Sequence, residues 1–175
     1  MRIDNKYFPA FMAVMALVSA LIIVYASLSF KDKEQTRFLN SISTNDTLTV
    51  KKMRYVHKDD SVSVSEFKGK NVVLLFFSSW SEKSNFMIDE IATLTDQNSS
   101  IHVIGALVKD ATDSIDFEAL PKNFTYVDGV SLYNDLKVPG VPSYVVFDKN
   151  GSYVYAHVGY QEGAGYSLLK QYIDD

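Results

Sequence analysis

The sequence predicts an α/β domain, a mixed sheet covered by helices on both faces, preceded by one N-terminal transmembrane helix. Two observations carry this prediction. Residues 7–30 form an uncharged, strongly apolar run, and residues 48–175 alternate short apolar runs of strand length with segments of helical periodicity. Strands separated by helices, and closed by a hairpin and a final helix, are typical of a mixed sheet covered on both faces.

The N-terminal apolar run covers residues 7–30 and contains no charged side chain. As a helix rising ~1.5 Å per residue it would reach about 36 Å, enough to span a hydrocarbon core of ~30 Å. A cleaved signal peptide is the alternative. We favour an uncleaved signal-anchor, because the run is longer than the usual ~7–15 apolar residues of a signal peptide. Lys and Arg lie on both sides of the run, so charge does not fix its orientation.

These features divide the chain into four parts. Residues 1–6 are a short N-terminal flank, and residues 7–30 are the membrane anchor. Residues 31–47 contain K-D-K-E-Q-T-R and S-I-S-T-N-D-T, which predicts a polar stalk. Residues 48–175 are the folded domain.

The first half of the domain begins with a predicted hairpin. Residues 48–56 and 61–64 flank a D-D pair that is typical of a turn. The next strand, 71–77, reads N-V-V-L-L-F-F, a continuous apolar run of the kind that is buried on both faces of a sheet. Residues 101–108 form a second such run.

Helices are predicted where apolar residues recur every three or four positions. Residues 84–94 have this spacing at positions 87, 88, 91 and 94. Shorter helices are predicted over 113–120, which stops at Pro121, and over 130–136.

The second half of the domain is predicted to end in a hairpin and a helix. A short strand over 124–127 comes first. Residues 143–147 and 152–158 then flank a D-K-N-G turn whose Gly151 suits a positive φ. A closing helix is predicted over 166–173.

Composition excludes several classes of function. The chain has no cysteine, which excludes disulfides, thiolate metal sites and cysteine nucleophiles. The net charge is −4 and no basic run is present, which argues against nucleic acid as a partner. Acidic residues near 110–118 do not have the spacing of a calcium loop. No metal and no cofactor is therefore predicted.

Two motifs resemble a known family. Residues 66–84 read E-F-K-G-K-N-V-V-L-L-F-F-S-S-W-S-E-K-S, similar to the thioredoxin-superfamily segment in which L-K-G-K leads into a strand ending F-W-A-S-W-C-x-x-C. Residues 140–151 read G-V-P-S-Y-V-V-F-D-K-N-G. That segment is similar to G-(I/V)-P-T-x-x-x-(I/F)-D-x-x-G of the membrane-tethered, extracytoplasmic branch that reduces disulfides during cytochrome maturation. The resemblance runs from about residue 48 to the C-terminus and implies a thioredoxin-like fold.

The sequence departs from the family at its redox centre. Ser81 and Ser84 stand where the family has the two cysteines of W-C-x-x-C. In the family, the first cysteine acts as a thiolate that the following helix stabilises. Serine forms no disulfide, and its hydroxyl stays protonated at physiological pH unless a base activates it. The resemblance therefore implies a domain without thiol–disulfide exchange.

A serine nucleophile is the other reading of Ser81. A hydrolytic serine needs a histidine base, and His57, His102 and His157 all lie far from Ser81 along the chain. Ser79 and Glu82 instead have the spacing of a capping box, so we interpret the serines of this loop as helix-capping residues.

The resemblance also implies a binding surface for a protein or an extended peptide. In the family, the tryptophan and a cis-proline lie beside the redox pair and meet the substrate. The corresponding residues are Trp80, Ser81, Val141, Pro142 and Ser143, with Pro142 in cis. Trp80 is either an exposed anchor for a partner or a scaffold residue half-buried over the helix start.

Three functional hypotheses follow. The leading one is a redox-inactive binding or scaffolding module, single-pass in the cell membrane, with its C-terminal domain on the extracytoplasmic side. The second is a thiol–disulfide oxidoreductase whose cysteines have been changed to serine, so that the protein is an enzyme only if Ser81 and Ser84 are cysteines in the native gene. The third is a structural subunit of a membrane assembly, in which the span is the interaction element.

Overall fold

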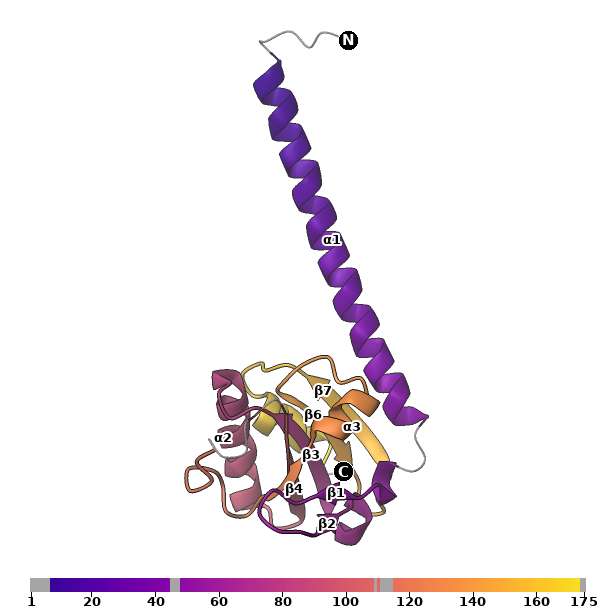
Figure 1. Ribbon diagram of the computed structural model, residues 1–175, viewed down its shortest axis with the longest axis vertical. Coiled ribbons are helices and arrows are strands. Elements are labelled where there is room, and N and C mark those ends of the chain that lie inside the picture. Colours follow the sequence, from indigo (N-terminus) through magenta and orange to yellow (C-terminus); the bar gives the residue numbers. More distant parts are fainter. Residues whose placement is uncertain (1–6, 45–47, 109, 111–114, 174–175) are drawn as a thin grey trace.

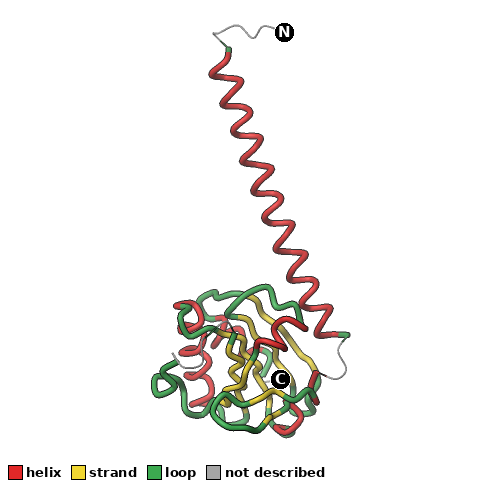
Figure 2. Tube along the Cα trace, viewed as in Figure 1, coloured by secondary structure: helices red, strands yellow, loops and turns green. Residues whose placement is uncertain are grey.

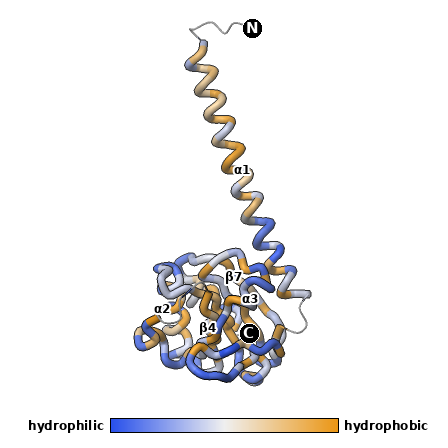
Figure 3. Tube along the Cα trace, in the orientation of Figure 1, coloured by the Kyte–Doolittle hydropathy of each residue, from blue (hydrophilic) through white to orange (hydrophobic). Residues whose placement is uncertain are grey.

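The computed structural model describes residues 7–44, 48–108, 110 and 115–173, as a long helix and a folded domain (Figure 1). Helix α1 (Phe8–Ser43) runs without interruption for 36 residues. Its apolar part stands clear of the domain, and the helix becomes hydrophilic only where it reaches the domain (Figure 3). Among the described residues, α1 is the one helix that is long and apolar enough to cross a membrane, by length and composition alone.

The C-terminal turns of α1 belong to the folded domain. Phe38 and Ile42, one helical turn apart, are 0% and 3% exposed and join the core on one face of the sheet. The segment 31–47, expected to be a polar stalk, is instead helical as far as Ser43 and packs on the domain. Its charged residues do not prevent this, because a helix can place them on the side that faces solvent while one apolar stripe faces the core.

The domain is built on a mixed sheet, which in the described residues has five strands in the order β5-β4-β3-β6-β7 (yellow in Figure 2). β3 pairs in parallel with β4, and β4 with β5, whereas β6 is antiparallel to both β3 and β7. The mixed sheet expected from the sequence is confirmed. The strands are β3 (Asn71–Phe77), β4 (Ile101–Leu107), β5 (Thr125–Asp128), β6 (Ser143–Phe147) and β7 (Tyr153–Val158).

The central strand β3 contributes to both halves of the core. All seven of its residues are buried, and successive side chains point to opposite faces of the sheet. One set packs with the end of α1 and with α3 (Val130–Asp135), and the other packs beneath α2 (Glu82–Gln97) and the C-terminal turns. Helices therefore cover both faces, as the sequence predicts.

Three peripheral segments differ from the sequence-based expectation: the first hairpin, the segment before Pro121 and the closing helix. The first hairpin is shorter, because β1 (Met53–Arg54) and β2 (Ser61–Val62) are flanked by the 3-10 turns η1 (Leu48–Val50) and η2 (Val64–Phe67). The helix expected over 113–120 lies partly outside the described residues. Its described part forms turns, with Phe117 packed on Tyr126.

The closing helix is divided in two. It consists of a π-helical turn, η4 (Ala164–Leu168), followed by α4 (Leu169–Gln171). The carboxylate of Glu90 on α2 accepts hydrogen bonds from the Tyr160 hydroxyl at 2.9 Å, the Gly163 N–H at 2.9 Å and the Gly165 N–H at 2.7 Å. These bonds hold η4 against α2. They also engage the N–H groups of Gly163 and Gly165 with a side chain of α2 at the place where the closing helix begins. A Cβ at position 165 would lie 2.9 Å from the Met87 carbonyl oxygen, so the close approach requires glycine there.

The Gly165→Ala variant should therefore lose about 1–3 kcal/mol of unfolding free energy, the usual effect of overpacking a core. Gly140→Ala is the matched control, because a Cβ at position 140 meets nothing within 4 Å. Denaturant unfolding of the full chain in detergent measures both. A Gly165→Ala protein as stable as the control would contradict the close packing of α2 against η4.

A second prediction concerns where the domain begins. A chain starting at Arg37 should unfold at higher denaturant concentration than a chain starting at Thr44, because it keeps Phe38 and Ile42. Burying one large apolar side chain contributes about 1.5–3 kcal/mol. Equal midpoints in circular dichroism would show that α1 is not part of the core.

Candidate functional site

The loop between β3 and α2 places Trp80 next to the start of a helix. Ser81 is the N-cap of α2, and its hydroxyl oxygen accepts a hydrogen bond from the Ser84 N–H at 3.3 Å. This bond satisfies one of the N–H groups that have no partner inside the helix. A helix start directly after Trp80, and a capping role for Ser81, agree with the sequence-based interpretation.

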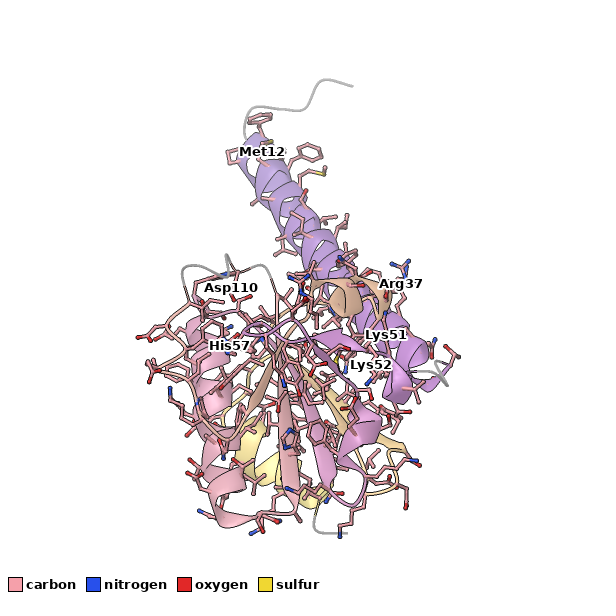
Figure 4. All side chains as sticks on the ribbon, turned by 60° about the horizontal axis from the view of Figure 1, so that its bottom comes forward. Met12, Arg37, Lys51, Lys52, His57 and Asp110 are labelled. Carbon is pink, nitrogen blue, oxygen red and sulfur yellow. The ribbon has the colours of Figure 1, made fainter. Side chains whose placement is uncertain are left out.

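The predicted capping box of Ser79 and Glu82 is wrong. The Ser79 N–H and hydroxyl donate to the two carboxylate oxygens of Asp110, at 2.8 and 2.9 Å. Asp110 follows the neighbouring strand β4 and lies at the end of the domain from which α1 projects (Figure 4). Sequence reasoning missed this pair because the two residues are 31 positions apart and no local pattern joins them. The domain does contain a capping box, formed by Ser63 and Glu66 at the start of η2.

The two serines at the family's cysteine positions have different environments. Ser81 is half-buried, whereas Ser84 is 0% exposed. The Ser84 hydroxyl accepts a hydrogen bond from the Ser78 N–H at 3.4 Å, and the Ser78 hydroxyl donates to the Val108 carbonyl. One position therefore reaches the surface, while the other is enclosed beneath the loop.

The loop before β6 lies beside the loop that carries Trp80. In the antiparallel pair of β3 and β6, Phe76 lies opposite Ser143, so the residues that follow β3 approach the residues that precede β6. The Val141–Pro142 peptide bond is cis, as expected. The structure thus brings together the two segments that the sequence marked as a binding surface.

Val141 has an unpaired peptide group at this place. Within the described part of the chain, neither its N–H nor its C=O has a hydrogen-bond partner. The neighbouring Pro142 carbonyl is occupied, because it accepts the Gly159 N–H at 2.8 Å, and the Ser143 hydroxyl donates to the Gly140 carbonyl at 2.7 Å. An unpaired donor and acceptor on one residue at the end of a strand can pair with an extended segment of another chain.

Aromatic side chains surround the start of α2. Trp80 is 68% exposed, so it is not half-buried over the helix start. Phe86, on the first turns of α2, is 45% exposed, and its ring lies 5.6 Å from the ring of Tyr160. Tyr160 follows β7, at the same end of the sheet as Pro142. We call Trp80, Phe86 and Tyr160 the aromatic end of the domain.

The three histidines, the candidate bases for a Ser81 nucleophile, are engaged elsewhere in the described part of the domain. His102 lies with its Nε2 atom 3.0 Å from the Thr125 hydroxyl, and burial lowers the pKa of His102 to about 4. His57 and His157 each pack against an aromatic ring elsewhere in the domain. Among the described residues, no group of three or more His, Cys, Asp or Glu side chains could hold a metal ion.

A groove of about 360 Å³ connects the loop before Pro142 with helix α1. Phe30, Glu34 and Gln35 of α1 line one side, and residues 139–141 line the other together with Val158 and Gly159. The sequence could not indicate this groove, because its walls come from segments about a hundred residues apart. The walls meet only because the C-terminal turns of α1 are buried against the domain, which the sequence did not predict.

The strand order, the helix that starts after the central strand and the cis-proline before β6 define a thioredoxin-like fold, and this chain carries it without a cysteine pair. The domain therefore has the fold of the thioredoxin superfamily.

Comparison with known proteins agrees with this fold. No protein-family model matches the sequence, and no curated protein matches it either. Among solved structures, DsbF of Mycobacterium tuberculosis is 16% identical and matches with a TM-score of 0.61, covering 73% of this chain and 95% of that one. A thioredoxin-like protein from Aeropyrum pernix is 17% identical, with a TM-score of 0.59 and coverage of 83% and 99%. A thiol:disulfide interchange protein of the thioredoxin family from Chlorobium tepidum is 14% identical, with a TM-score of 0.56 and coverage of 70% and 92%.

The double variant Ser81→Cys/Ser84→Cys should fold and form an internal disulfide on oxidation. The two side chains already lie next to each other at the helix start, and a disulfide needs only Cα atoms within about 7 Å and suitably directed Cβ atoms. Thiol titration before and after oxidation measures the loss of free thiols. Migration on a non-reducing gel shows whether the disulfide is internal or joins two chains. The single Ser81→Cys variant is the control for intermolecular bonds. A folded double variant that keeps both thiols would argue against the alignment of these serines with the family's cysteines.

Proposed function

We propose that this protein is a membrane-anchored binding module outside the cytoplasm, which holds an extended segment of a partner protein at the surface formed by Trp80, Ser81, Val141, Pro142 and Ser143. It does so without thiol–disulfide exchange, because no thiol is present. The anchor is helix α1, and the extracytoplasmic side rests on the resemblance to the membrane-tethered branch of the family.

The observation that carries this proposal is the exposed Trp80 on the loop after β3, together with the unpaired peptide group of Val141 on the neighbouring loop before β6. A large exposed aromatic ring supplies an apolar anchor, and truncation of such an anchor is among the most damaging changes at an interface. The N–H and C=O of Val141 supply up to two main-chain hydrogen bonds to a strand-like ligand. This combination favours recognition of backbone shape together with one apolar side chain.

A second candidate function is thiol–disulfide exchange in a native protein with cysteines at positions 81 and 84. The observation in its favour is that Ser81 is partly exposed and Ser84 is enclosed at a helix N-terminus. A nucleophilic thiol and its resolving partner need such a pair of environments. The native gene sequence distinguishes this candidate from the binding module at once.

The third candidate is a structural subunit whose membrane span is itself the interaction element. Deleting residues 1–34 separates it from the binding module. The structural subunit would lose all association with its partners, whereas the binding module would keep its affinity for a soluble peptide.

Trp80→Ala should weaken association with the partner by about 2 kcal/mol, roughly thirtyfold, while the domain stays folded. Tyr153→Ala is the matched control, because Tyr153 is an aromatic residue with 38% exposure at the opposite end of β7. The measurement is the yield of crosslinked adducts in native membranes, with circular dichroism to confirm folding. Equal yields from wild type and Trp80→Ala would remove Trp80 from the binding surface.

A further inference from the structure

We infer that the aromatic end of the domain rests against the lipid surface of the membrane that α1 crosses. This inference rests on the proposed membrane anchoring. It goes beyond the proposed function, because it gives Trp80, Phe86 and Tyr160 a lipid contact in addition to their place beside the peptide-binding loop.

The first step is the rigid connection between the span and the domain. Helix α1 continues without a break from Phe30, the last residue of the apolar run, to Ser43. Phe38 is fully buried in the domain, and the Ser41 hydroxyl donates to the Leu136 carbonyl. Phe38 lies eight positions after Phe30 along the helix, which is about 12 Å. The domain is therefore fixed close to the membrane and does not hang from a flexible linker.

The second step identifies the end of the domain that faces the membrane. Phe30 lines the same groove as residues 139–141, so the loop before Pro142 is level with the end of the apolar run. The loops before β6 and after β7, and the N-terminus of α2, lie at the end of the domain from which α1 projects (Figure 1). The turn between β6 and β7 lies at the other end of both strands.

The third step concerns the side chains on this end. Trp80 and Phe86 are 68% and 45% exposed, and the ring of Tyr160 lies beside that of Phe86. Tryptophan and tyrosine favour the interface between lipid and water, because one part of the ring is apolar and another part is polar. Because α1 holds the domain at the bilayer, the rings meet lipid at a high effective concentration, and a few rings are sufficient to maintain the contact.

Charge indicates which lipid surface fits. Glu82 and Lys83, two and three residues after Trp80, are both exposed and carry opposite charges, and the carboxylate of Asp110 accepts hydrogen bonds from Ser79. The loop thus has no surplus of positive charge that would attract an anionic headgroup layer. The proposed surface is therefore zwitterionic phospholipid, with the aromatic rings at the level of the headgroups.

The chain carries its own probe, because Trp80 is its only tryptophan. The full chain is reconstituted into phosphatidylcholine vesicles with and without a phosphatidylcholine brominated near the carbonyl end of its acyl chains. Bromine quenches tryptophan emission only on close contact. The expected result is a clear loss of Trp80 emission in the brominated vesicles, with a blue shift relative to the protein in detergent.

The matched control moves the reporter to the opposite end of the domain. In the variant Trp80→Phe/Lys149→Trp, the reporter stands on the exposed turn between β6 and β7, and circular dichroism verifies that the domain is folded. Its emission should be the same in both kinds of vesicle. Equal quenching at positions 80 and 149 would overturn the inference, because the contact would then not be specific to the aromatic end.

Flotation of the vesicles after an alkaline carbonate wash separates this inference from the proposed anchoring. A protein that floats with the vesicles while Trp80 remains unquenched keeps its anchor and overturns the lipid contact. A protein that is washed off lacks the anchor, and the lipid contact is overturned together with it. Quenching at position 80 alone, in floating vesicles that contain no other protein, supports lipid as the contact.

Discussion

The burial of Phe38 and Ile42 against the sheet makes the long helix and the domain a single body. Each side chain contributes apolar burial of the order of 1.5–3 kcal/mol, which is enough to keep the last turns of α1 docked rather than freely hinged. The same contact covers one face of β3 and completes the core that begins with Val72, Leu74 and Phe76. It also creates the groove beside Pro142, because one wall of that groove is α1 itself. The orientation of the site relative to α1 thus depends on two apolar side chains.

The serines at the family's cysteine positions are compatible with this architecture, because their hydroxyl oxygens accept hydrogen bonds from backbone N–H groups at or just before the start of α2. Ser81 caps α2 and Ser84 accepts the Ser78 N–H, so the backbone of the loop remains satisfied without a thiol. Asp110 secures the other side of the loop through Ser79. The loop is therefore held in place without a redox pair. The Trp80 ring is exposed, and the Val141 peptide group has no hydrogen-bond partner among the described residues, and both features suit binding.

The sequence could predict the parts of the fold that depend on local pattern. The continuous apolar run of β3 and the helical spacing within α2 each specify an element, and the two motifs placed Trp80 and Pro142 together. It could not predict that α1 continues into the domain, because Phe38 and Ile42 stand among polar residues and their burial depends on strands far along the chain. The sequence could not predict the bonds between Ser79 and Asp110 for the same reason. A capping box is a local pattern, but the bond that replaced it is a long-range contact whose geometry exists only after β3 and β4 have paired.

A binding surface held against lipid restricts which partners can use it. The Trp80 ring can be buried against lipid or against a protein, so a soluble partner gains only the difference between the two contacts. A chain that leaves the bilayer beside α1 meets a different situation. If α1 spans the membrane as proposed, such a chain would enter the groove next to Phe30 and extend along residues 139–141 to the peptide group of Val141. Such a segment need not lift the domain from the membrane. The rigid docking of α1 would therefore select partners by the place where their chains emerge from the membrane as well as by their sequence.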